Sequence, residues 1–334
     1  MLIKEALLKE NNNFNLLRII LASLVIMYHS LAIFPHSTFT DPVKKYFLVV
    51  STGGLAVKVF FFLSGMLVTN SLIQKNSVFD FIFSRAKRIL PAYFFVIITS
   101  CFLIGPIISN LNLYLYFKSE GLWSYLLNNL SFRTSFFLPG VFSESKYAFN
   151  GSIWTIPVEI KCYTLLISIY GLLRFFSIKL AITICFFAVA LPLTPVRDVF
   201  FASGGDPAIY MLAPCFALGC TMSIFKDRIK LIATPFLMVL LLSLIVKNET
   251  AKSYLICFPF CILSIFIFTR KSIVKFRIRN DVSYGMYLWG FPVQQITYHY
   301  ITDNVFLGCT LSFIISYFLG LASWIYIEKP FIKT

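Results

Sequence analysis

Blocks of apolar residues, each about 20 residues long, recur along the chain and are separated by short polar or basic connections. A helix needs roughly this length to cross the hydrocarbon core of a bilayer. The pattern therefore predicts an all-α bundle of about ten transmembrane helices rather than one buried core. The predicted spans are residues 14–34, 53–73, 89–108, 152–173, 177–194, 207–225, 229–246, 252–269, 281–301 and 305–327.

The composition agrees with this pattern. Of 334 residues, 58% are hydrophobic and only 13% are charged, which is roughly half the charged share of a soluble domain. The net charge of +15 gathers in connections on one side of the predicted bundle, such as 83–88 and 270–279. Because this follows the positive-inside rule, we expect both termini to be cytoplasmic. The basicity is then a consequence of topology, and no nucleic-acid partner is predicted.

The whole chain, residues 1–334, is predicted to form a single membrane-embedded domain without a fused extracytoplasmic domain. Its longest connection is an outer loop from about 109 to 151. Within this loop, WSYLLNNLSF at 123–132 is too short to span a bilayer. It lies at the interface, re-enters the membrane, or serves as a plain connector.

Cysteine is frequent but does not indicate a metal centre. The eight cysteines sit almost wholly within apolar segments and form no C-x-x-C pair. Cys257 and Cys261 share a helix face, but no histidine or carboxylate lies nearby in sequence to complete a metal site. We therefore expect buried thiols that act as small apolar side chains, and no metal.

A few ionisable side chains lie at predicted membrane depth, where each costs several kcal/mol unless it is paired or hydrated. Arg18 and His29 share the first span, eleven positions apart. On a helix this spacing places both on one face, about 16 Å apart along the axis. Aligned polar groups at two depths suit a passage between a cytoplasmic donor and an external acceptor. The remaining candidates are Lys58, Glu159 and Lys161.

Histidine suits the reacting end of such a passage, because its unperturbed pKa lies near neutrality and it can take a proton from a hydroxyl group. His29 and Arg18 are therefore candidate catalytic residues, and Arg18 is also a candidate for contacting the donor. The alternatives are a histidine that only packs between helices and an arginine that snorkels to the interface.

Glu159 is predicted to lie at the depth of His29, to within one helical turn. A carboxylate there would orient the imidazole, stabilise its charged form, or hold the acceptor sugar. The alternative is that Glu159 and Lys161 neutralise other charges structurally.

Arg85 and Arg88 are three positions apart, just before the third predicted span. This spacing places both guanidinium groups on one helix face, where they would bind the phosphates of coenzyme A. Binding to anionic lipid headgroups is the competing interpretation.

Six ordered segments resemble the acyltransferase-3 family of integral membrane acyltransferases. The first contains the Arg-x10-His signature of the family, here Arg18 and His29, and the third contains its Arg-x-x-Arg motif. The segments are NNNFNLLRIILASLVIMYHS at 11–30, GGLAVKVFFFLSGMLV at 53–68, FSRAKRILPAYF at 83–94, SIWTIPVEIKCY at 152–163, DVSYGMYLWGFPVQQ at 281–295 and SWIYIEKP at 323–330. In one departure, Gly290 stands where many members carry a second histidine.

The resemblance implies a ten-helix enzyme of a bacterial cytoplasmic membrane. Its donor would be acetyl-CoA or a related acyl-CoA, and its acceptor a surface glycan or lipid-linked saccharide. It also implies a catalytic role for His29 and Glu159, an essential Arg18, and donor binding by Arg85 and Arg88.

Two mechanisms remain open at this point: direct attack by the acceptor hydroxyl and a covalent acyl-histidine relay. The alternative function is a proton-coupled transporter or flippase that uses Arg18, His29 and Glu159 as its pathway. A scaffold without chemistry leaves the aligned pair unexplained.

Overall fold

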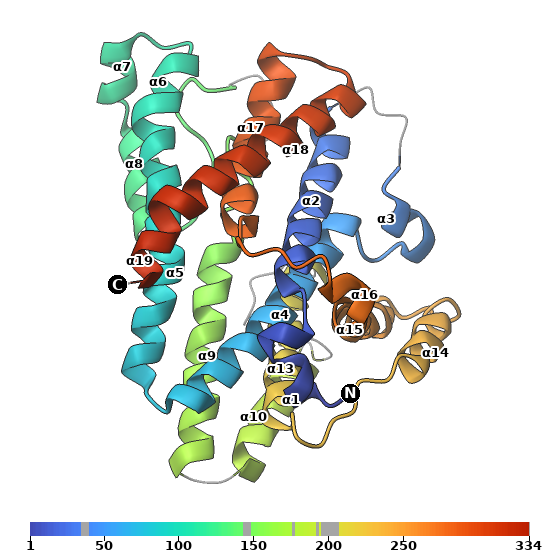
Figure 1. The fold of residues 1–334 in the computed structure, drawn as a ribbon. Coiled ribbons are helices and arrows are strands. Elements are labelled where there is room, and N and C mark those ends of the chain that lie inside the picture. The colour runs from blue at the N-terminus through green and yellow to red at the C-terminus, as the bar shows by residue number, and fades with distance from the viewer. Residues whose placement is uncertain (35–39, 143–147, 176–177, 192–193, 195–206, 334) are drawn as a thin grey trace. The chain divides into compact units, whose positions relative to one another are not determined.

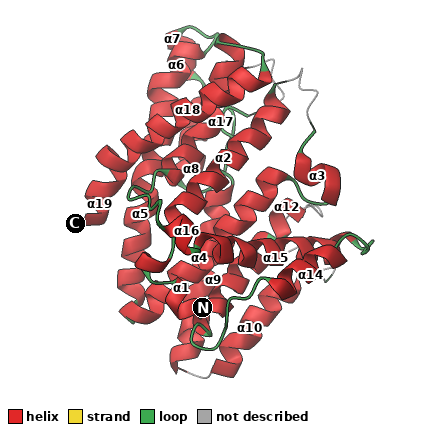
Figure 2. Cartoon of the chain, turned by 45° about the vertical axis from the view of Figure 1, so that its right-hand side comes forward, coloured by secondary structure: helices red, strands yellow, loops and turns green. Residues whose placement is uncertain are grey.

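The computed structural model describes all residues except 35–39, 143–147, 176–177, 192–193, 195–206 and 334. The described part is helical throughout, apart from turns, loops and one isolated bridge between Leu2 and Lys230 (Figure 2). The predicted all-α class is therefore confirmed.

Within the described residues, six helical stretches are long and apolar enough to cross a membrane. Three of them are single helices near the predicted bounds of their spans: α2 (Phe14–Ile33), α4 (Thr52–Lys75) and α15 (Glu249–Phe268). The fourth, α9 (Thr155–Phe175), begins three residues later than predicted. The fifth joins α5 (Val78–Thr99), a π-helical turn (Ser100–Ile104) and α6 (Gly105–Ile108). The sixth joins α18 (Val305–Ala322), the π-helical segment η4 (Ser323–Glu328) and α19 (Lys329–Lys333).

The other four predicted spans form shorter or less apolar helices. Pro214 removes an amide donor near the start of its span, and the helix there is interrupted at Met211. The helix at 281–301 carries two glutamines in its second half and falls outside the six. The four are α10 (Ile178–Ala190), α12 with α13 (Pro207–Tyr210 and Leu212–Ile224), α14 (Thr234–Leu242) and α17 (Ser283–Tyr300). Ten crossings and cytoplasmic termini therefore remain predictions.

The helix that carries the third predicted span begins eleven residues before the span itself. The third span was expected to begin at 89, but α5 begins at Val78. FDFIFSRAKR continues the helix because it contains neither glycine nor proline. Arg85 and Arg88 consequently lie inside a helix, two to three turns from its start.

The chain contacts divide into two compact units, and each is described here by itself. The first comprises Met1–Tyr28, Phe39–Phe81 and Lys161–Arg279. In it, α4 packs along α13 and α15, α13 packs on α10, and α15 packs on α14. The unit also holds α1 (Ile3–Ala6), a 3-10 turn (Lys9–Asn11), α3 (Pro42–Phe47) and α16 (Lys271–Val274). Figure 1 shows these elements in blue and in yellow-green to orange.

The close contact between α4 and α13 in the first unit depends on two glycines. A Cβ atom added to Gly65 of α4 would lie 2.2 Å from the carbonyl oxygen of Phe216 in α13. A Cβ atom added to Gly219 would lie 2.2 Å from the carbonyl oxygen of Phe62. Small residues let two membrane helices approach at backbone distance, where van der Waals packing holds them together.

We therefore expect Gly65→Ala to lower stability by about 1–3 kcal/mol, the range for overpacking a dense core. The measurement is the thermal unfolding midpoint of the purified protein in detergent. Gly171→Ala in α9 is the matched control, because nothing lies within 4 Å of an added Cβ atom there. It should leave the midpoint unchanged or slightly raised. Equal midpoints for the two variants would contradict this packing.

The second unit comprises His29–Thr38, Ile82–Ile160 and Asn280–Thr334. Its main helices are α5, α17 and α18. The side chain of Tyr284 reaches the carbonyl oxygen of Ile89, and the rings of Phe95 and Trp289 meet further along. The later residue of α17 thus contacts the later residue of α5, so the two helices run parallel. The long outer loop of the prediction contributes two short helices, α7 (Leu113–Lys118) and α8 (Glu120–Leu130). Residues 143–147 of that loop lie outside the described residues.

Candidate functional site

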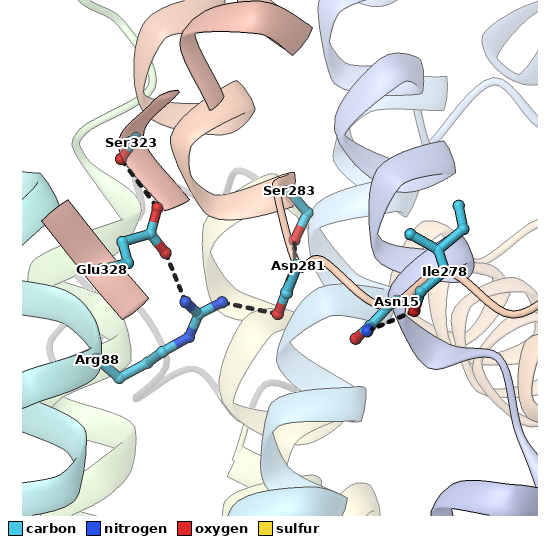
Figure 3. A network of polar contacts seen from close by, with 7 residues as sticks. All are labelled: Asn15, Arg88, Ile278, Asp281, Ser283, Ser323 and Glu328. Atoms are coloured by element: carbon cyan, nitrogen blue, oxygen red, sulfur yellow. Dashed lines mark hydrogen bonds and ion pairs between the residues drawn. The ribbon is translucent and has the colours of Figure 1, made fainter. Parts of the chain in front are cut away.

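The asparagine-rich start of α2 fixes the position of this helix. Asn13 is buried, and its side-chain amide donates to the carbonyl oxygens of Ile273 and Phe276 at 3.0 and 3.1 Å. Asn15 donates to the carbonyl oxygen of Ile278 at 2.9 Å (Figure 3). These bonds hold α2 against rotation about its axis. They thereby set the direction of Arg18, which lies within one turn of Asn15 and is partly buried.

His29 lies one turn before the end of the same continuous helix, on the face of Arg18 by helical periodicity. The His29 side chain is partly buried, and its ring meets the ring of Phe291 edge-on at 5.0 Å between centroids. The next residue, Ser30, accepts a hydrogen bond from the Gln294 amide at 2.6 Å. Phe291 and Gln294 are three residues apart and share one face of α17. The face of α17 that carries Phe291 and Gln294 therefore contacts the C-terminal part of α2.

An apolar cluster lies behind the histidine. Ile33, Phe34 and Phe291 are all at most 5% exposed and pack together, with Ala148, Tyr298 and Val305 at their edge. Gly151 is pressed against this cluster, because an added Cβ atom would lie 2.7 Å from the ring of Phe291. Such a wall keeps water from one side of the imidazole and strengthens electrostatic interactions there.

The chain before α9 runs along α17 and is held to it by polar side chains. Gln295 donates to the carbonyl oxygen of Ala148 at 2.7 Å. Asn150 donates to that of Leu288 at 3.1 Å. The hydroxyl groups of Thr155 and Tyr287 lie 3.0 Å apart. These contacts place the start of α9, and hence Glu159, relative to α17.

Glu159 is partly buried and lies in the neighbourhood of Tyr284 and Tyr287. His29 lies instead beside Phe291, four to seven residues further along α17. At 1.5 Å per residue the offset is about 6–10 Å, or one to two turns. This offset is between the α17 neighbours of Glu159 and His29 and not between the two side chains themselves, so their matching depth remains a prediction.

The two lysines among the candidates differ in environment. Lys58 is 1% exposed in α4, and its ammonium group donates to the carbonyl oxygen of Gly54 at 3.3 Å. Lys161 is exposed on α9. Neither forms an ion pair with a residue in the described part of the chain.

Arg88 is not an open phosphate ligand in this structure. Its Nη2 atom lies 2.7 Å from Asp281 and its Nη1 atom 2.5 Å from Glu328 (Figure 3). The guanidinium group also lies over the ring of Trp324 at 5.2 Å. Arg85, one turn earlier, has neither a hydrogen bond nor an ion pair with any described residue, and its Nε atom is buried. The structure thus separates two arginines that the sequence treats alike.

Several polar residues of the second unit were absent from the sequence-based candidates. Glu328 follows the last residue of the last predicted span, yet its side chain is completely buried. Asp281 is the first residue of its predicted span. A signal was available, since each is a rare carboxylate within a segment that carries the family resemblance. Gln294 and Gln295 gave no comparable signal, because their partners come from distant parts of the chain.

No group of three or more histidine, cysteine or carboxylate side chains able to hold a metal ion is present among the described residues.

The helical fold and the six described helical stretches that are long and apolar enough to cross a membrane indicate a polytopic membrane protein. The family model described as an acyltransferase domain matches residues 11–328. The chain belongs to this family, and it is an acyltransferase. The transporter interpretation gains no support from this match.

Two relatives are similar to the chain. An "O-acetyl transferase" of Shigella phage Sf6 is 28% identical over 97% of this chain and 96% of its own length. A "Putative peptidoglycan O-acetyltransferase YrhL" of Bacillus subtilis (strain 168) is 24% identical over 83% of this chain and 50% of its own length. No solved structure matches.

Proposed function

We propose that the protein transfers an acyl group, acetyl in the simplest case, from acetyl-CoA to a hydroxyl group of a cell-surface glycan or its lipid-linked precursor. The proposal places it in a bacterial cytoplasmic membrane. Its main support is the match to a phage O-acetyl transferase over nearly the full length of both chains. The second relative is named as acting on peptidoglycan, which supports a glycan acceptor.

The proposed reaction is direct transfer with His29 as general base. The imidazole takes the proton of the acceptor hydroxyl group while the hydroxyl oxygen attacks the carbonyl carbon of the thioester. The tetrahedral intermediate collapses, the carbon–sulfur bond breaks, and the imidazolium returns the proton to the departing thiolate. The products are the glycan ester and CoA.

The donor is proposed to lie along α5 and α17, with its phosphates at Arg85. Arg88 lies near Tyr284, and His29 lies near Phe291, so these two levels are about 10 Å apart along α17. Arg85 is one further turn from His29. The long arm of CoA suits a passage of this depth. Arg18, about 16 Å from His29 along α2 and on the same helix face, is proposed as a further contact of the donor on the strength of this spacing alone.

Glu159 is proposed to stabilise the imidazolium through space. The α17 neighbours of Glu159, Tyr284 and Tyr287, precede Phe291, the neighbour of His29, by one to two turns. A Coulomb interaction tolerates an offset of this size inside a helix bundle.

The decisive experiment is acyl transfer by the purified protein in lipid nanodiscs. We expect release of CoA from acetyl-CoA that depends on added glycan acceptor, and one added acetyl group in the glycan mass spectrum. Cells with and without the protein should show the same mass difference in their surface glycans. A single turnover without acceptor separates the mechanisms, because a relay would release CoA and leave labelled protein. Unchanged glycans with unconsumed acetyl-CoA would overturn the proposed function.

A further inference from the structure

A cluster of charged side chains in the second unit is built from parts of the chain to which the proposed function assigns no role. Arg88 comes from α5, Asp281 from the turn before α17, and Glu328 from the end of the π-helical segment η4 (Figure 3). The two carboxylates belong to the DVSYG and SWIYIEK segments of the sequence. One guanidinium group therefore joins three segments that are far apart in sequence.

Both carboxylates are themselves fixed. The Ser283 hydroxyl donates to Asp281 at 2.6 Å, and the Ser323 hydroxyl donates to Glu328 at 2.9 Å. The exposed side-chain fractions are 19% for Arg88, 9% for Asp281 and 0% for Glu328. A planar guanidinium can bridge two carboxylates in this way, whereas an ammonium group cannot reproduce the geometry. The orientation of Arg88 is thus determined by its surroundings.

The charge of the cluster opposes a role for Arg88 as a phosphate ligand. One arginine faces two carboxylates, so the cluster carries one net negative charge. A phosphate group brought to it would meet repulsion that is weakly screened away from bulk water. Arg85 lies on the same helix face and has no partner of its own among the described residues. A dianionic phosphate would find its favourable contact there.

We propose that Asp281 and Glu328 are positioning residues that hold Arg88, and through it the first turns of α5, so that Arg85 rather than Arg88 contacts the phosphates of the acyl donor. This inference rests on the proposed function for the identity of the donor. Of the two arginines at 83–88, Arg85 then contacts the donor, and Arg88 is held by the two carboxylates.

The test compares KM for acetyl-CoA with kcat in purified protein. Arg85→Gln should raise KM about 10-fold or more, the effect of losing a charge-assisted contact of about 1.5–3 kcal/mol, with little change in kcat. Arg85→Lys should retain much of the affinity. Asp281→Asn and Glu328→Gln should each raise KM several-fold. The matched control is Glu120→Gln, an exposed carboxylate of α8 outside the cluster, which should leave KM unchanged.

The double variant Asp281→Asn/Glu328→Gln distinguishes a phosphate-binding Arg88 from a positioning Arg88 by the direction in which KM for acetyl-CoA changes. It releases Arg88 from both carboxylates. If Arg88 were a phosphate ligand, its freed charge would lower KM for acetyl-CoA. Positioning predicts a higher KM. Moreover, Glu328→Gln should have little further effect on KM in the Arg85→Gln protein, because it acts through Arg85. A lower KM in the double variant, or independent effects of Glu328→Gln and Arg85→Gln, would overturn the inference.

Binding of unacylated CoA, measured as a thermal shift in detergent, separates this inference from the proposed function. CoA binding that depends on Arg85, Asp281 and Glu328 supports the inference even if no acyl transfer is detected. Acyl transfer whose KM and CoA binding are insensitive to all three substitutions supports the function and overturns the inference. Rescue of CoA binding by Glu328→Asp, relative to Glu328→Gln, would further support positioning by charge.

Discussion

Replacing His29 with glutamine is expected to lower kcat for acyl transfer by roughly 10²–10⁴, the usual contribution of a positioned general base. Glutamine keeps a polar side chain of similar length beside Phe291 but cannot accept a proton from the acceptor. KM for acetyl-CoA should change little, because the donor phosphates are proposed to bind at Arg85. The measurement is the steady-state rate of acceptor-dependent CoA release by purified protein.

His299 provides a matched control for this substitution. It lies on α17, where its Nδ1 atom is 2.9 Å from the carbonyl oxygen of Gln295 and its ring stacks on Phe142 at 4.1 Å. His299→Gln should leave kcat within a few-fold of the original. If His29→Gln retained more than half of the original kcat, general-base catalysis at this position would be excluded.

The bounds of a helix could be predicted where an apolar run is itself long enough to cross a membrane. Residues 14–34, 53–73 and 252–269 became α2, α4 and α15 with nearly the expected bounds. The prediction was less accurate where a polar stretch remains helical, as in FDFIFSRAKR before residue 89, or where proline and short length interrupt an apolar run, as at 207–225. Hydropathy does not distinguish these cases, because it ignores backbone geometry and the partners that satisfy polar groups.

The candidate site could be predicted as residue types but not as partners. Helical periodicity placed Arg18 and His29 on one face without any tertiary information. The difference between Arg85 and Arg88 depends on carboxylates about 190 and 240 residues away in sequence. Nothing in the local spacing indicates which arginine is paired. The position of the start of α9 likewise follows from the contact of Thr155 with Tyr287, which a span boundary cannot reveal.

Replacing Glu159 with glutamine is the second substitution with a large expected effect. If Glu159 acts on the imidazolium from a distance of about 8 Å, Coulomb's law at an effective dielectric constant of 20 gives about 2 kcal/mol, which corresponds to roughly 30-fold in rate. Because Glu159 is partly exposed, screening should reduce this to about 10-fold. The loss should appear in kcat, since the imidazolium forms only during proton transfer.

The kinetic parameter that changes distinguishes the roles open to this carboxylate. If Glu159 instead holds the acceptor sugar, Glu159→Gln would raise KM for the acceptor and leave kcat nearly unchanged. If it only neutralises neighbouring charges, the thermal midpoint would fall without a selective effect on either parameter. Glu159→Asp keeps the charge and shifts it by one methylene, so a through-space role predicts most of kcat restored, whereas a direct hydrogen bond to the ring predicts little. A kcat that falls equally in both variants would therefore contradict stabilisation through space, because Coulomb interaction at this range depends weakly on a shift of that size.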